Sequence, residues 1–120
     1  YFEQIKICLF TNDNVSEQVS PAAKTMFLNN SFPDELIEGA PANLHKPQPG
    51  NKKKLMGCLM KLKDEINNIE LLISKTTFKG KTKHPGLNYF NAKEWFQFAE
   101  MHFRHHLRQK KRIDDFFKYR

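Results

Sequence analysis

The sequence has little of what marks membrane and secreted proteins. No apolar run in its 120 residues approaches the ~20 residues that a membrane-spanning helix needs. The first ten residues carry neither the basic start nor the cleavage site of a signal peptide. There are only two cysteines, Cys8 and Cys58, and they form no Cys-x-x-Cys pair. Because both lie among apolar residues, we expect two buried free thiols in a cytoplasmic protein and no disulfide framework.

The sequence also lacks any strand with clean alternation of apolar and polar residues, which favours an all-α fold. The length fits a single domain, 1–120, with one modest core. Apolar spacing and capping residues predict helices at about 1–11, 21–29, 51–75 and 91–109, the last with a continuation toward the C-terminal residues. The stretches between the longer helices, about 30–50 and 76–90, are predicted as long connections.

The clearest helical pattern is a stripe of leucines and isoleucines that are alternately four and three residues apart. Its members are Leu55, Leu59, Leu62, Ile66, Ile69 and Ile73. Charged side chains lie mostly off this stripe, which is the pattern of a helix that is apolar on one side. The stripe therefore predicts core packing against neighbouring helices.

Acidic residues are fewer than basic ones, 13 against 20, which gives a net charge of +7. The basic residues form short runs at Lys52–Lys54, Lys79–Lys83 and Arg108–Arg112. Such runs can hold a phosphate backbone. No motif of a nucleic-acid-binding fold accompanies them, so solvated helix ends and loops are favoured over a nucleic-acid partner.

Three of the five histidines fall within five residues, at His102, His105 and His106. On a helical wheel of about 100° per residue, His102 and His106 share the face of Trp95 and Phe98, and His105 lies at its edge. We therefore expect two imidazoles, one turn apart, to point into the interior. The arginines of this helix, together with Lys93 and Glu100, fall on the opposite side.

Two imidazoles at i and i+4 can reach one ion, as they do in HExxH helices, although Phe103 precludes that motif here. Zinc, nickel and iron all accept imidazole nitrogen. The alternative is a pair of core histidines hydrogen-bonded to neighbouring groups, and spacing alone leaves the two hypotheses about even.

A catalytic metal normally has at least three protein ligands. His84 is predicted at the wrong end of the last helix, where it would anchor the turn that precedes the helix. His45 lies in the long connection, and nothing in the sequence fixes its position. Because the chain begins as if in mid-helix, we expect the third ligand to be a histidine upstream of Tyr1.

The segment KHPGLNYFNAKEWFQFAEMHFRHHLRQ resembles the last-helix signature of the DinB/YfiT-like metalloenzyme superfamily. The matching residues are His84-Pro85, Glu94-Trp95, His102, His106 and Gln109. The resemblance is specific over residues 83–112 and extends to residues 1–75 only as a helix pattern. Asn88 stands where the family usually has glycine.

The resemblance implies a four-helix bundle with up-down-down-up connectivity and a divalent metal, commonly zinc or nickel, held by three histidines at one end. Two of these ligands correspond to His102 and His106. The implied activity is that of a metal-dependent hydrolase or thiol-dependent transferase, which would act on a small molecule, with a low-molecular-weight thiol as a further cofactor. His105 could be an acid–base group or a structural histidine, and Arg104, Arg108 and Lys111 could meet an anionic substrate or only solvent.

Two other functions stay open at this point. One is a non-catalytic interaction or stress-associated helical module with a degenerate metal site. The other is a basic nucleic-acid-associated protein, which ranks last because the histidines are predicted to face inward and the arginines outward. A helix face could also pair two copies into a homodimer.

Overall fold

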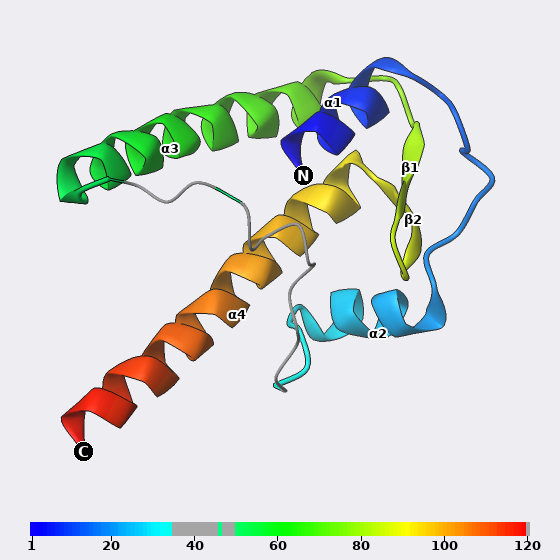
Figure 1. Cartoon of the computed structure of the whole chain (residues 1–120). Helices are drawn as coiled ribbons and strands as arrows, with labels where there is room; N and C mark the ends of the chain where they lie inside the picture. Colours follow the sequence, from blue (N-terminus) through cyan, green and yellow to red (C-terminus); the bar gives the residue numbers. More distant parts are fainter. Residues whose placement is uncertain (35–45, 47–49, 120) are drawn as a thin grey trace.

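The computed structural model describes residues 1–34, 46 and 50–119, and over these residues it contains four helices and one two-stranded sheet. In chain order the elements are α1 (Phe2–Phe10), α2 (Pro21–Asn29), α3 (Lys52–Lys75), β1 (Lys81–His84), β2 (Asn88–Asn91) and α4 (Ala92–Lys118) (Figure 1). Every predicted helix is present, and α4 takes in the predicted continuation. None of the described helices is both long and apolar enough to cross a membrane.

Side-chain caps begin three of the helices, close to the starts predicted from the sequence. Ser20 accepts a hydrogen bond from the Ala23 backbone N at 3.1 Å, with Pro21 in the first turn of α2. Asn51 caps α3 in the same way. The predicted capping box of α4 is complete: Asn91 and Glu94 each accept from the other's backbone N, at 2.8 and 2.9 Å. These bonds satisfy amides that have no partner within the helix.

A β-hairpin replaces part of the connection predicted at 76–90, so the all-α expectation is wrong for these residues. The strands β1 and β2 pair antiparallel with Lys81 opposite Asn91 and His84 opposite Asn88. Gly86 and Asn88 supply the positive φ angles of the turn, +94° and +67°. Each strand has only four residues, mostly polar, which is too short and too polar for period-2 alternation to stand out in the sequence.

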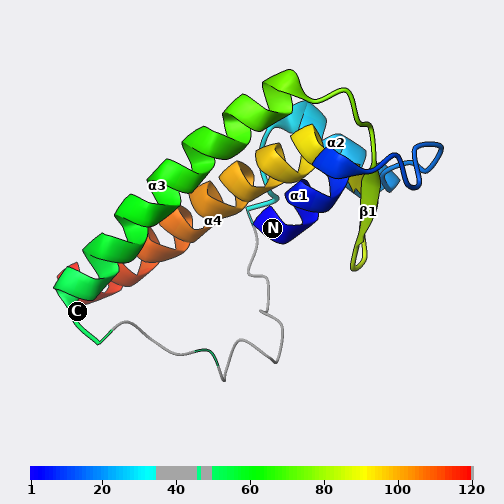
Figure 2. The same cartoon turned by 90° about the horizontal axis from the view of Figure 1, so that it is seen from above.

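The core lies at one end of the molecule, where α1 packs against both α3 and α4 and the hairpin covers the start of α4 (Figures 1 and 2). Residues from all four helices and from β2 are buried there. They are Ile5, Cys8, Leu9, Ala23, Phe32, Ile69, Phe90, Ala92, Trp95, Phe98 and Met101. From this end α3 and α4 diverge, as Figure 1 shows. In the view from above in Figure 2, α3 overlaps α4.

The stripe on α3 is only partly core, in contrast to the prediction. Ile69 is 1% exposed and Ile73 packs against the core, but Leu55 and Leu59 are 43% and 44% exposed. The reason is the length of α1. Its nine residues cover about 14 Å, whereas the 24 residues of α3 run for about 36 Å. The N-terminal half of α3 therefore extends beyond the helix that covers its other end.

The cysteines confirm one part of their prediction and contradict another. Both are free thiols, and Cys8 is buried at the core, where its Sγ lies 3.6 Å from the Phe90 carbonyl oxygen. Cys58 is exposed, because it lies in the half of α3 that extends beyond the core.

Replacing Phe90 with alanine tests the importance of this core. Phe90 is fully buried, and its ring contacts those of Trp95 and Phe98 at centroid distances of 4.9 and 5.3 Å. We expect Phe90→Ala to lower the free energy of unfolding by about 3–5 kcal/mol, because it leaves a cavity. Urea denaturation measures this loss. The matched change Phe10→Ala, at a side chain that is 63% exposed, should cost less than about 1 kcal/mol; equal losses would contradict the position assigned to the core.

Candidate metal centre

An aromatic cluster at the core end positions the first turns of α4. Trp95 is buried and donates from Nε1 to the hydroxyl of Thr82 on β1 at 2.8 Å. Tyr1, just before α1, packs its ring against Trp95 and Phe98 at 5.8 and 5.6 Å between centroids. The start of α4 is therefore held between the hairpin and α1, and this contact fixes the direction in which the next turns of α4 face.

The histidines do not face as the wheel centred on Trp95 predicted. His105 is 3% exposed, whereas His102 is half-buried and His106 is exposed. The buried face is centred instead on Phe98, Met101 and His105, which lie within about 60° of one another on the wheel. Trp95 is buried at the edge of this face because the hairpin covers the first turn of α4. His102 is therefore at the margin of the core and His106 lies outside it.

The rings of His102 and His106 nevertheless lie together. Their centroids are 4.5 Å apart and their planes differ by 30°. His102 also contacts the rings of Tyr1 and Phe32, each at 5.4 Å. The i, i+4 spacing thus produces two near-parallel imidazoles at the edge of the core, open to solvent on the side of His106.

Each of these two rings has a hydrogen-bond partner at Nδ1. Nδ1 of His102 contacts the hydroxyl of Tyr1. Nδ1 of His106 donates to Oε1 of Gln109 at 2.7 Å. Because an amide oxygen can only accept, the proton of a neutral His106 is on Nδ1 and the lone pair is on Nε2. No hydrogen bond among the described residues involves Nε2 of either ring.

Burial sets the protonation of His102 and His105. It lowers the pKa of His102 below the ordinary histidine value, and the neighbouring His106, His105 and His84 add to this effect. Burial also lowers the pKa of His105, and the charge of Arg108 reinforces it. Both rings are therefore neutral at neutral pH, which is the state in which an imidazole nitrogen can bind a metal.

His105 belongs to a structural contact and not to the pair. Nη2 of Arg108 donates to its Nδ1 at 3.1 Å, and Nε2 of Gln109 lies 3.4 Å from its Nε2. Its ring also packs on Phe32 at 5.5 Å. Gln109 therefore spans His105 and His106, which links the buried histidine to the exposed one.

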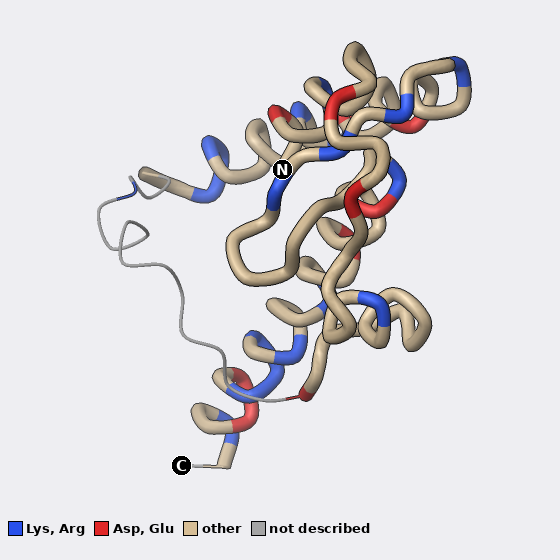
Figure 3. Tube along the Cα trace, turned by 90° about the vertical axis from the view of Figure 1, so that its right-hand side faces the viewer, with Lys and Arg blue, Asp and Glu red and all other residues tan. Residues whose placement is uncertain are grey.

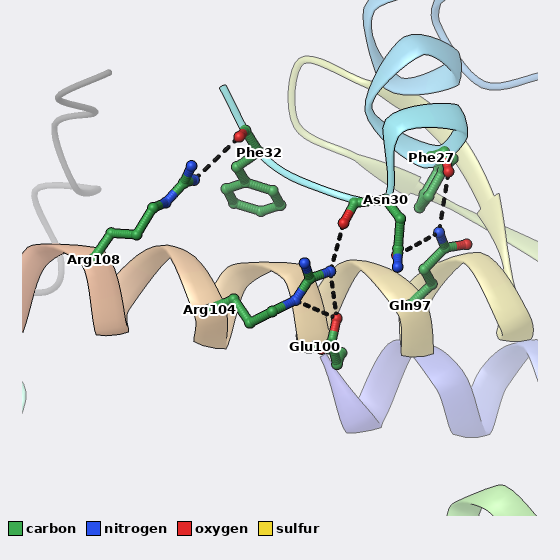
Figure 4. A network of polar contacts seen from close by, with 7 residues as sticks. All are labelled: Phe27, Asn30, Phe32, Gln97, Glu100, Arg104 and Arg108. Atoms are coloured by element: carbon green, nitrogen blue, oxygen red, sulfur yellow. Dashed lines mark hydrogen bonds and ion pairs between the residues drawn. The ribbon is translucent and has the colours of Figure 1, made fainter. Parts of the chain in front are cut away.

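Arg104 and Arg108 donate hydrogen bonds to backbone carbonyl oxygens of the segment that follows α2, as Figure 4 shows. They therefore do not form a free solvated face. Arg104 donates to the Asn30 carbonyl oxygen and to Glu100, and Arg108 donates to the Phe32 carbonyl oxygen at 3.1 Å. The cationic side chains are thus largely occupied by carbonyl oxygens. Lys111, by contrast, is exposed and paired with Asp115 at 2.7 Å.

His84 lies nearer to the pair than its position in the sequence suggests. β1 folds back along α4, so that the His84 ring stacks on Phe90 at 5.2 Å and contacts Phe98 edge-on at 4.9 Å. Its carbonyl oxygen also accepts from Leu87 in the hairpin turn, at 3.3 Å, in keeping with the predicted role at the turn. His45 lies outside the described residues.

The described residues would supply two ligands to a metal ion at this position. Across the described part of the chain, no three or more His, Cys, Asp or Glu side chains gather where they could hold an ion. His102 and His106 fit a divalent metal by their donor type, by their proximity and by Nε2 atoms that have no hydrogen-bond partner among the described residues. A closed structural site of four protein ligands does not fit this donor set.

Two groups that orient the pair, Tyr1 and Gln109, were not predicted from the sequence. Tyr1 was treated only as the first residue of a helix, although its ring and its hydroxyl both contact His102. Gln109 was noted as part of a pattern, without a role. For Gln109 a signal was available, since a residue three positions after His106 lies next to it on a helix. Tyr1 carried no such signal, because its contact with α4 spans 101 positions.

Comparison of the chain with models of protein families, with curated proteins and with solved structures finds no match. None of these comparisons identifies a DinB/YfiT-like family, so membership of that family stays a prediction from residues 83–112.

The lowered histidine pKa values predict a stability that falls in mild acid. Below about pH 6.5 the unfolded chain binds protons that buried, neutral His105 and His102 do not, so folding becomes less favourable as the pH falls. We expect the Tm to decrease from about pH 7.5 to about pH 5.5, a range in which carboxylates titrate little. Differential scanning calorimetry with a chelator present measures it.

His105→Gln should flatten this pH dependence by removing one of the titrating groups. Ile69→Ala, which destabilises the core from α3 without removing a histidine, should leave the slope as it is. A wild-type Tm that rises toward pH 5.5 would contradict the assignment.

Proposed function

We propose that this chain is a metal-binding helical domain in which His102 and His106 are two ligands of a divalent ion, with zinc or nickel as the preferred metals. We further propose that it belongs to the class of metal-dependent hydrolases or thiol-dependent transferases that act on small molecules. The DinB/YfiT-like four-helix bundle with up-down-down-up connectivity is the fold family that this proposal implies.

One observation carries the proposal. The two imidazoles lie 4.5 Å apart between centroids, and each has a polar partner at Nδ1 but none among the described residues at Nε2. Metal-binding histidines commonly engage their second ring nitrogen with an oxygen atom, which fixes the ring and the tautomer. Tyr1 and Gln109 are positioned to do this for His102 and His106.

The chain's own residues would perform three tasks. His102 and His106 would hold the ion through Nε2. Gln109 would keep the proton of His106 on Nδ1. Phe32 and Phe98, which pack beside His102, would exclude water from its inner side. The chemistry that a bound divalent metal supplies in such proteins is Lewis-acid activation of a water or a thiol.

A second function is favoured by a different observation. The N-terminal half of α3 leaves a regular apolar stripe exposed, as a helix that docks a partner does. A non-catalytic interaction module with a degenerate metal site would explain this stripe and would require no third ligand. Metal content separates the two functions.

We expect the protein expressed from its complete gene and purified without chelators to carry about one divalent ion per molecule, and His102→Ala and His106→Ala each to lose most of it. Removing one of so few ligands should weaken binding by about 100-fold or more. Elemental analysis after dialysis gives the stoichiometry, and titration with zinc gives the affinity.

The matched control is His84→Ala, the same chemical change at a histidine of the same aromatic cluster, and it should leave the metal content unchanged. Circular dichroism verifies that each variant is folded. A metal-free wild type would favour the interaction module, and a metal content that survives both substitutions would place the ion elsewhere.

A further inference from the structure

The exposed half of α3 lines an apolar groove. The groove has a volume of about 680 Å³ and lies between α3, α4 and the start of α1. Leu59, Leu62 and Ile66 form one wall, and Phe96, Ala99 and Phe103 form the other. Lys63, Glu70 and Glu100 also line it. The groove opens where α3 and α4 diverge (Figure 1).

The spacing of the α3 wall specifies a helix as the occupant. Leu55, Leu59, Leu62 and Ile66 are separated by four, three and four residues, which places them at d, a, d and a of a heptad. This 3.5-residue period is the seam of a coiled coil, in which each side chain inserts between residues of a facing helix. All four are between 37% and 44% exposed, so the seam has no full partner within the chain.

We propose that the occupant is the same half of α3 from a second copy, packed antiparallel across a two-fold axis that passes between Met60 and Lys61. In this register Leu55 faces Ile66 of the partner subunit, and Leu59 faces Leu62 of the partner subunit. Each layer then pairs a d residue with an a residue, and every contact occurs twice, as a two-fold interface requires.

The charge distribution along α3 supports the antiparallel direction. The N-terminal half, up to Lys61, carries four lysines and no acidic residue, whereas all three acidic residues, Asp64, Glu65 and Glu70, lie beyond it. Figure 3 shows how basic and acidic residues are distributed along the chain trace. Antiparallel packing brings the basic first turn, Lys52–Lys54, of one copy beside Glu70 of the partner subunit. A parallel pair would instead bring the two lysine-rich ends together, which costs energy by like-charge repulsion.

The second wall of the groove adds to the interface. Phe103 and Leu107 on α4 are 55% and 49% exposed on the side where α4 diverges from α3. A partner α3 in the groove would cover Phe103, so that α3 and α4 of both copies form an intermolecular bundle. This inference does not depend on the histidine pair.

Sedimentation equilibrium tests the assembly. We expect the wild type to have about twice the 14.2 kDa chain mass. Leu59→Glu should raise the dissociation constant by about 100-fold or more, because it places a carboxylate in an apolar seam. The control is Met60→Glu, the same charge one residue along, at a side chain that is 66% exposed and off the seam; it should remain dimeric. Since Leu59 is itself 44% exposed, neither change should unfold the chain, and circular dichroism verifies this.

Disulfide cross-linking tests the register. In a Cys58→Ser background, Leu55→Cys and Ile66→Cys chains are oxidised separately and as a mixture with copper phenanthroline. Only the mixture should give abundant linked dimers, through positions 55 and 66 of different copies. A parallel pair would link Leu55→Cys chains to each other. That result would overturn the proposal, as would a monomeric wild type, which leaves the groove to another occupant, or a dimer that survives Leu59→Glu.

Discussion

The contact of α1 with the first turns of α4 is the constraint on which the rest of the structure depends. Ile5 and Leu9 of α1 are buried in the same cluster as Trp95 and Phe98, and Ile69 joins them from α3. This one cluster holds four helices and the hairpin together. Because α1 is only nine residues long, the cluster cannot extend along α3 and α4, and both long helices leave it with an apolar side uncovered.

Local patterns predicted the helices well because apolar spacing marks each of them and α2, α3 and α4 also begin at a side-chain cap. Ser20, Asn51 and Asn91 are these caps. The hairpin was not predicted, because its stability comes from elsewhere: Tyr89 donates to the Gln18 carbonyl oxygen, and Phe90 is buried against α4. Contacts of this kind, between residues distant in the sequence, leave no periodic signal in four-residue strands.

The proximity of His102 and His106 could be predicted from the sequence, but the side of α4 on which they lie could not. The i, i+4 spacing correctly brought His102 and His106 together, since helix geometry alone decides that contact. Which side of α4 is buried depends on what covers each turn, and the covering segment changes along the helix. The hairpin covers Trp95, whereas Phe32 covers His105. A helical wheel centred on Trp95 assumes that the same side of the helix is buried along its whole length. It therefore placed His106 in the buried face and His105 at the edge, whereas in the structure His105 is buried and His106 is exposed.

The histidine pair and the apolar groove lie next to each other on α4, because both border the part of this helix that α1 does not cover. Ala99 and Phe103, which line the groove, flank His102 on α4, and Tyr1 lines the groove while its hydroxyl contacts His102. A helix seated in the groove would therefore border the pair and cover one of its sides. Water would then reach His106 chiefly from the side of Gln109. The dimer and the metal are inferred from different observations, but both would involve this region of α4. The partner subunit's helix would enclose one side of the histidine pair that would hold the metal.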